Sequence, residues 1–291
     1  MARPVILEVA VNGPTRKEQQ PRVPVSIDEL INDGLECLAL GASIFHHHDE
    51  FRAFPDKEPL SMARRSAEVF AELQRKFPRA LMYPTANAYH LADGVKMWEQ
   101  HEHLAEMGLI DMALLDPGST LLWRPTENGA PGSGILYGYS PRDIATINSR
   151  CRDLNLAPSI SCFEPGYVRI VAAYARSGQL APGALVKLYF GTDRQPFGHP
   201  PSPEALNLYL DLLADSQLPW ACAVLGGDIV QSGFADEVLA RGGHLRVGLE
   251  DYEGERHVSN AELVTEAVEA ILRSGNSVAT HDETRDILGI R

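Results

Sequence analysis

Eight short apolar runs alternate with longer amphipathic stretches along this chain of 291 residues. Short apolar runs bounded by turn residues are typical of buried strands, and apolar residues at helical spacing after Ser or Pro indicate helices. The predicted strands are Val5–Val11, Leu38–His46, Leu81–Pro84, Met112–Leu115, Ser159–Phe163, Leu185–Phe190, Trp220–Leu225 and Leu245–Leu249. The predicted helices are Ser26–Leu40, Ser61–Phe77, Gly94–Met107, Pro141–Leu154, Val168–Ser177, Pro203–Ala214, Gly233–Arg241 and Asn260–Ser274. Eight such units predict an α/β fold, a (β/α)8 TIM barrel, rather than an open doubly wound sheet.

The chain is expected to form a single barrel domain over residues 1–291, because no segment has the composition of a linker. Its hydrophobic content of 44% is ordinary for a folded protein with a sizeable core, so disorder is not indicated. The Gly- and Pro-rich segment Arg124–Gly134 is expected to be a long loop after the fourth strand. In a barrel, such a loop lies at the active-site end.

The chain carries 26 basic and 39 acidic residues, and this net charge of −13 disfavours binding to nucleic acid or to anionic membranes. No apolar run reaches the roughly 18 residues that a membrane span requires, and no secretory segment is evident. We therefore expect a cytoplasmic location and neither a nucleic-acid nor a membrane partner. Apolar surroundings without CxxC spacing predict reduced core cysteines at Cys37, Cys151, Cys162 and Cys222.

Two histidines, His46 and His48, stand at i, i+2 spacing where the second predicted strand ends. Alternate side chains of a strand point to the same face, so these two imidazoles are expected to converge. Two neutral imidazoles make half of a Zn²⁺ site, which needs one or two further ligands. On spacing alone, a hydrogen-bonded structural cluster is an equally good interpretation.

Two adjacent carboxylates, Glu250 and Asp251, follow the last predicted strand. In a barrel the second and eighth strands both lie near the first, and polar groups at the C-terminal strand ends meet at the mouth. Glu250 can therefore join His46 and His48. Two imidazoles, one carboxylate and an open position are typical of catalytic zinc.

Three further polar features allow more than one interpretation. Arg246 is either the partner of a barrel carboxylate or a fixed positive charge that orients Asp251 or a substrate anion. Glu164 is either a partner of a ligand histidine or an acceptor that fixes a loop. A second pair, His101 and His103, falls in a helical stretch, where i, i+2 side chains do not share a face, so we expect both to be solvated.

Together these residues resemble the β-keto acid cleavage enzymes, whose prototype is 3-keto-5-aminohexanoate cleavage enzyme. The most specific part is Gly-Gly-His-Leu-Arg-Val-Gly-Leu-Glu-Asp at 242–251, followed by Ser-Asn-Ala-Glu-Leu-Val at 259–264. The resemblance covers nearly the whole chain. It implies a zinc-dependent (β/α)8 enzyme that condenses a β-keto acid with acetyl-CoA and cleaves a carbon–carbon bond, giving an acyl-CoA and acetoacetate. It also implies a homo-oligomer, commonly a tetramer.

The resemblance also implies roles for individual residues. The zinc ligands are matched by His46, His48 and Glu250. The base is matched by Asp251, the arginine that assists it by Arg246, and an acidic catalytic residue on the fifth strand by Glu164. Hydroxyl groups that contact the substrate are matched by Thr85 and Ser119, and the substrate-recognition segment after the first strand contains Asn12 and Thr15.

One departure from the family pattern concerns the substrate. The prototype has a glutamate shortly after the first strand that recognises the substrate's amino group, whereas here Thr15 is nearest, followed by Arg16 and Lys17. A neutral or anionic substrate side chain is therefore favoured. Two other readings stay open: another metal-dependent barrel enzyme, a hydrolase or lyase, and a metal-binding homologue without activity.

Overall fold

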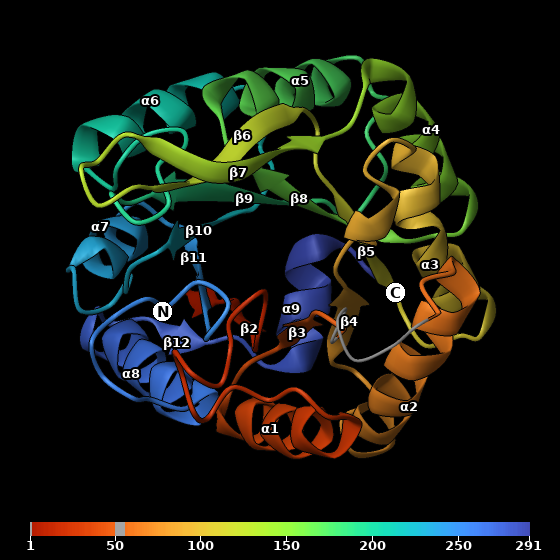
Figure 1. Ribbon diagram of the computed structural model, residues 1–291, viewed down its shortest axis with the longest axis horizontal. Coiled ribbons are helices and arrows are strands. Elements are labelled where there is room, and N and C mark those ends of the chain that lie inside the picture. Colours follow the sequence, from red (N-terminus) through yellow and green to blue (C-terminus); the bar gives the residue numbers. More distant parts are fainter. Residues whose placement is uncertain (1, 50–55) are drawn as a thin grey trace.

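An eight-stranded parallel sheet forms a ring inside a ring of helices, as the sequence predicts (Figure 1). The computed structural model describes residues 2–49 and 56–291. The barrel strands are β2 (Leu7–Ala10), β3 (Ile44–His47), β4 (Leu81–Pro84), β5 (Met112–Leu115), β8 (Ala157–Cys162), β9 (Leu185–Gly191), β10 (Trp220–Leu225) and β11 (His244–Val247). Their order is β4-β3-β2-β11-β10-β9-β8-β5. The end strands β4 and β5 pack against each other, so the barrel is nearly closed.

The helices of the outer ring lie close to their predicted bounds. They are α1 (Ile27–Leu40), α2 (Pro59–Lys76), α3 (Gly94–Glu106), α4 (Pro141–Asp153), α5 (Pro165–Arg176), α6 (Pro203–Leu213), α7 (Phe234–Ala240) and α8 (Asn260–Arg273), with a 3-10 turn at η1 (Ala88–His90). Reciprocal capping boxes open α1, α4 and α8, at Ser26, Ser140 and Ser259. Each box satisfies backbone N–H groups that the first helical turn leaves unpaired.

One helix that the sequence analysis missed, α9 (His281–Leu288), covers the end of the barrel opposite the mouth. Thr284 donates a hydrogen bond to Ser43, and Arg285 donates to the backbone carbonyl of Arg79; both partners lie just before barrel strands. Nearby, the short strands β1 (Pro4–Val5) and β12 (Ser277–Val278) pair in parallel. The helix has only eight residues, too few for a clear apolar period.

The predicted strand Leu38–His46 was wrong at its start. Residues 38–40 are the last residues of α1, and the strand itself begins at Ile44. Gly41 has a φ of 121° and its N–H bonds to Cys37 and Leu38 carbonyls, which ends the helix. The apolar residues that end α1 run directly into those of β3. Hydrophobic pattern alone does not separate a helix end from a strand that follows it so closely.

The predicted loop Arg124–Gly134 was also wrong, because most of it belongs to an antiparallel hairpin. Strands β6 (Ser119–Pro125) and β7 (Pro131–Gly138) pair with each other and join no other strand of the described residues. Gly129, with a φ of 78°, lies in the turn. Leu121 and Leu136 face each other across the hairpin and are 63% and 69% exposed, whereas Leu122 and Tyr137 pack against the core.

The layer between the strands and the helices is apolar. The four cysteines are free and buried, as predicted. Within the described residues, no helix combines the length and the apolar character needed to cross a bilayer. Inside the ring of strands, in contrast, several charged side chains are fully buried, among them Glu8, Lys187 and Arg246. Arg246 connects this buried group to Glu250 at the mouth of the barrel.

Candidate metal centre and active site

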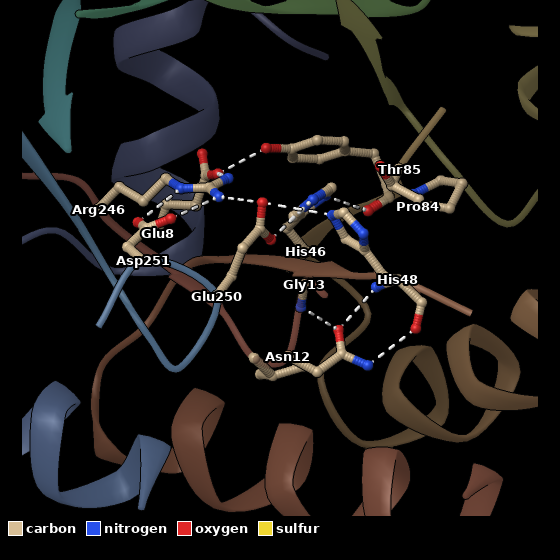
Figure 2. Close-up of polar contacts among 12 residues, drawn as sticks. Glu8, Asn12, Gly13, His46, His48, Pro84, Thr85, Arg246, Glu250 and Asp251 are labelled. Atoms are coloured by element: carbon tan, nitrogen blue, oxygen red, sulfur yellow. Dashed lines mark hydrogen bonds and ion pairs between the residues drawn. The ribbon is translucent and has the colours of Figure 1, made fainter. Parts of the chain in front are cut away.

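His46 and His48 lie at the C-terminal end of β3, and their side chains point to the same side (Figure 2). His47 between them points away, towards α2. The ring of His47 packs against Phe70 of α2, with centroids 5.2 Å apart. The rings of His46 and His48 stand 5.2 Å apart and nearly perpendicular. The strand alternation therefore brings the two imidazoles together, as the sequence predicts.

Glu250 from the β11 end completes a three-residue cluster with these histidines. The donor atoms of His46, His48 and Glu250 all lie within 4.8 Å of one another. His46 Nε2 is 3.2 Å from Glu250 Oε2, and His48 Nε2 is 3.3 Å from Oε1. Ligand atoms about 2.0–2.1 Å from one tetrahedral Zn²⁺ ion stand about 3.3 Å apart, so these separations fit a shared cation.

The protonation pattern of His46 strengthens this fit. His46 Nδ1 lies 3.2 Å from the Tyr83 carbonyl, which can only accept a hydrogen bond, so the proton belongs on Nδ1. Nε2 then presents a lone pair to Glu250 Oε2, a buried oxygen that no hydrogen-bond donor reaches among the described residues. A cation between these two lone pairs would satisfy both, and holding a ligand imidazole through its second nitrogen is common at metal sites.

Asn12 fixes the backbone of His48. Its side-chain NH₂ donates to the carbonyls of His48 and Pro24, at 2.8 and 3.2 Å, and its Oδ1 accepts from the N–H groups of His48 and Gly13. Both protons and both lone pairs of this amide are thereby used on the protein. The predicted substrate contact of Asn12 stays a prediction, and these contacts also suit a residue that positions His48.

Replacing Asn12 with alanine is expected to weaken metal binding about 10- to 100-fold, because His48 loses two hydrogen bonds that hold its backbone. Metal affinity measured by competition with a chelator checks this. Asn148→Ala is the matched control, since that buried amide also bonds two backbone groups, those of Gln179 and Ala181, far from the mouth. Equal metal affinities for the two variants would contradict the role assigned to Asn12.

A glycine turn aims the two carboxylates that follow β11. Gly248 has a φ of 138°, and a Cβ there would lie 2.1 Å from the carbonyl oxygen of Ala10, so this turn excludes other residues. The strand consequently ends at Val247 and not at the predicted Leu249. The N–H of Glu250 then bonds to the same Ala10 carbonyl, which directs the following side chains to the mouth.

Arg246 contacts three carboxylates at once (Figure 2). Its Nε and Nη2 donate to the two oxygens of Asp251, both at 3.0 Å, and Nη2 also lies 2.8 Å from Glu250. Its Nη1 donates to Glu8 at 2.9 Å. A two-pronged contact fixes the position and the orientation of a carboxylate. Both interpretations of Arg246 therefore hold: it pairs with a barrel carboxylate, and it orients Asp251.

The two neighbouring carboxylates differ in pKa. Burial alone would raise the pKa of Glu250, but the charges of Arg246, His48 and His46 hold it well below its usual value. Burial raises the pKa of Asp251 to about 6, against the opposing charge of Arg246. Environments that separate the pKa values of two carboxyl groups in this way suit them to different tasks: Glu250 stays anionic, and Asp251 is able to take up a proton.

Comparison with known proteins agrees with the family resemblance found in the sequence. A family model described as beta-keto acid cleavage enzyme matches residues 4–290. The chain belongs to this family. It is 25% identical to a 3-keto-5-aminohexanoate cleavage enzyme of Fusobacterium nucleatum over all of both chains. It is also 25% identical to a 3-oxoadipate:acetyl-CoA acetyltransferase of Cupriavidus necator, over 100% of this chain and 96% of the relative.

A solved structure shares the fold of this β-keto acid cleavage enzyme family member. It is a ternary complex of ObcA with a C4-CoA adduct and oxalate, at a TM-score of 0.70 and 15% sequence identity. The likeness covers 92% of this chain and 68% of that one. At this identity the comparison supports the barrel architecture only.

Below the metal cluster, this family member holds a buried charged layer that the sequence analysis missed. Glu8 Oε1 accepts hydrogen bonds from Tyr83 at 2.5 Å, Lys187 at 3.2 Å and Arg246 at 2.9 Å. Burial alone would raise the pKa of Glu8, but the charges of Lys187 and Arg246 lower it to about 2. Glu8 lay within a run read as apolar, and its partners are 179 and 238 residues away, so no local pattern indicated it.

Replacing Glu8 with glutamine is expected to lower the free energy of unfolding by about 3 kcal/mol at pH 7, because two buried cations lose their anion. The folded pKa of about 2 lies below the ordinary value of 4.5, so this contribution is complete above about pH 5 and is lost as pH falls towards 2. Urea unfolding at pH 7 and pH 3 should therefore show a smaller difference between wild type and variant at pH 3.

Glu72→Gln is the control for this prediction. Glu72 pairs with Arg75 on the surface of α2, and exposed pairs contribute well under about 1 kcal/mol. A Glu8→Gln variant as stable as Glu72→Gln, or a difference from wild type independent of pH, would refute the account of the buried layer.

The other predicted site residues lie around the mouth in different settings. Thr85 follows β4, is 7% exposed, and its N–H bonds to the carbonyl of His47. Thr15 and Ser119 donate their hydroxyl protons to backbone carbonyls of Leu249 and Tyr139. The roles that the resemblance implies for these three residues stay predictions.

Glu164 begins α5 and contacts neither the histidines nor Arg246 in the described part of the chain. Its Oε1 accepts hydrogen bonds from the Thr120 hydroxyl at 2.8 Å and from the Gly198 N–H at 3.2 Å. It therefore connects the base of the β6–β7 hairpin with the loop after β9. This geometry matches the loop-fixing interpretation, and a catalytic role for Glu164 stays a prediction.

The expectation that His101 is solvated was wrong. His101 is fully buried on α3, its ring nitrogens lie 3.0 Å from the carbonyls of Trp98 and Pro84, and its ring stacks on Trp98. The i, i+2 rule excluded a shared metal site with His103 correctly, but it says nothing about which face of the helix is buried.

Two hollows open beside the metal cluster. A cavity of about 220 Å³ is lined by Glu250 together with Thr15, Tyr252 and residues of the hairpin and the β9 loop. A larger cavity of about 1200 Å³ adjoins it and is lined by Asn12, Thr15, Arg16 and Lys17 among others. The donor set therefore faces space large enough for small-molecule ligands.

Proposed function

We propose that this protein is a zinc-dependent β-keto acid cleavage enzyme that uses acetyl-CoA. The reaction converts a β-keto acid and acetyl-CoA into an acyl-CoA and acetoacetate, so the acyl group that contains the keto carbon exchanges places with the acetyl group. The observation that carries the proposal is the joining of two units at the barrel mouth: the donor cluster of His46, His48 and Glu250, and the Arg246–Asp251 pair beside it.

The metal would be held by two imidazoles and one carboxylate, a set typical of catalytic zinc with a coordination position left open. When bound there, such an ion supplies Lewis acidity that polarises a carbonyl group. We propose zinc for this reason. A metal analysis of protein purified without added metal tests the identity of the ion, since the same ligand set also suits Fe(II).

Asp251 is proposed to take the proton from the carbon between the keto and carboxyl groups of the substrate. The carbanion forms a bond to the acetyl carbonyl carbon of acetyl-CoA, and the CoA thiolate leaves. The thiolate then attacks the original keto carbon, the old carbon–carbon bond breaks, and Asp251 returns the proton to acetoacetate. Arg246 holds Asp251 in place on both oxygens throughout, which fixes the direction of proton transfer.

A panel of β-keto acids with acetyl-CoA and metal-loaded protein tests the proposal. We expect at least one acid to give acetoacetate and a new acyl-CoA in equal amounts. Mass spectrometry detects both products. If no acid of the panel gives either product, the proposal is wrong. The alternatives would then be a different metal-dependent enzyme, a hydrolase or lyase, or an inactive metal-binding homologue.

Three properties of the protein in solution remain proposals. We propose a homo-oligomer, commonly a tetramer in this family, a cytoplasmic location, and one barrel domain over residues 1–291. Light scattering of the purified protein tests the first directly. A monomer at micromolar concentration would exclude the oligomer without affecting the chemistry proposed above.

A further inference from the structure

The cavity of about 220 Å³ that Glu250 lines is also lined by two arginines, Arg124 and Arg194. Arg124 lies on β6, near the tip of the hairpin, and Arg194 lies in the loop after β9. One cavity thus touches both a proposed metal ligand and two guanidinium groups. A small ligand seated at the metal has its far end near these arginines.

Few carboxylates neutralise these arginines. Arg124 Nη1 pairs with the carboxylate of Glu253, 2.5 Å from Oε1, and Gln195 donates to the same oxygen. Arg194 Nη1 donates to the backbone carbonyl of Glu253 at 2.6 Å, and no carboxylate of the described residues forms an ion pair with it. Two guanidinium groups and one nearby carboxylate leave an unbalanced positive charge, in a chain whose net charge is −13.

The other carboxylate of this cavity is already committed. Glu250 faces His46, His48 and Arg246, so it does not compensate the arginines. Arginine presents several N–H donors in a fixed plane, and only one nitrogen of each guanidinium is used in the contacts above. The free donors suit a carboxylate, whereas a cationic group there would meet like charge.

We infer that the substrate is a β-keto acid with a second carboxylate at its far end, held by Arg124 and Arg194. The inference rests on the proposed function and narrows its substrate class. The names of the relatives do not decide the matter, since they include a 3-oxoadipate acetyltransferase and enzymes named for amine-bearing acids. The charge of the pocket lining decides it here.

The phosphates of CoA are the other source of negative charge. The whole pantetheine arm separates them from the sulfur, and a cavity of about 220 Å³ that also touches Glu250 is too short for that arm. The adjoining cavity of about 1200 Å³, lined by Arg16 and Lys17, has the room that CoA needs; Arg124 lines both cavities, whereas Arg194 lines only the smaller one. The experiment below separates the two sources through the separate KM values of the acid and of acetyl-CoA.

The test compares three acids of equal chain length: 3-oxoadipate, 3-oxohexanoate and 6-amino-3-oxohexanoate. With metal-loaded wild-type protein, kcat/KM for 3-oxoadipate should exceed that for 3-oxohexanoate about 10- to 100-fold, and the amino acid should be the poorest substrate. Arg194→Gln should remove about tenfold of this preference, and Arg124→Gln with Arg194→Gln most of it. Both losses should come through KM of the acid, and KM of acetyl-CoA should stay unchanged.

Arg176→Gln is the matched control, because Arg176 is exposed at the far end of α5. Equal use of 3-oxoadipate and 3-oxohexanoate would overturn the inference and leave the proposed function intact. Arginine variants that raise KM of acetyl-CoA with every acid would overturn it in favour of CoA phosphates. If no acid is turned over, the proposed function fails, and calorimetry then decides the inference: 3-oxoadipate must bind wild type and not the double variant.

Discussion

Replacing Asp251 with asparagine is expected to lower kcat about 10³- to 10⁴-fold while the protein stays folded and keeps its metal. Asparagine has nearly the shape of aspartate but cannot accept a proton, and loss of a positioned general base has effects of this size. Metal binding should persist, because Asp251 pairs with Arg246 and is not among the three clustered donors. Kinetics and metal analysis on the same preparation check both halves.

The control for this prediction is Asp111→Asn. Asp111 also pairs with an arginine, Arg285, but at the opposite end of the barrel. It should leave kcat within about twofold of wild type. Asp251→Ala gives a second readout if the asparagine amide disturbs Arg246. Substantial activity in both Asp251 variants would show that another group takes the proton.

Replacing Glu250 with alanine is expected to remove both the metal and the activity. Without this carboxylate, two imidazoles remain, and two ligands seldom hold zinc against a chelator. The fold should survive, since Arg246 keeps its contacts with Glu8 and Asp251. Activity below about a thousandth of wild type, with metal content near zero after dialysis, is the expected result.

Comparing the Glu250→Ala and Asp251→Asn variants distinguishes the proposed metal ligand from the proposed base. Asp251→Asn should be inactive with metal, and Glu250→Ala inactive without it. A Glu250→Ala protein that retains one metal ion per chain would refute the ligand assignment. Circular dichroism and thermal unfolding should show both variants folded, so that neither loss can be attributed to misfolding.

The sequence predicted the clustering of His46, His48 and Glu250 because each of these residues lies at a strand end. The i, i+2 histidines report strand alternation directly, and the barrel rule brings Glu250 to the same rim. The structure then resolves what spacing left open. Arg246 pairs with barrel carboxylates and orients Asp251 in the same contact.

The residues that the sequence did not indicate act across long separations. Glu8 and Lys187 meet only after the barrel closes, and neither lies in a polar segment that marks a site. Arg124 was assigned to a loop, although the hairpin places it over the mouth beside Glu253. Such contacts depend on the register of the barrel strands and on tertiary packing, and neither can be predicted from the local hydrophobic periodicity of the sequence.

The central claim is that acetyl-CoA donates its acetyl group to carbon while its CoA passes to the rest of the substrate. The most direct measurement uses acetyl-CoA labelled with ¹³C in the acetyl group, an active β-keto acid and metal-loaded protein. We predict that the label appears only in acetoacetate, that the new acyl-CoA is unlabelled, and that neither forms after metal removal until metal is restored. Label in the new thioester, or equal rates without metal, would contradict the account.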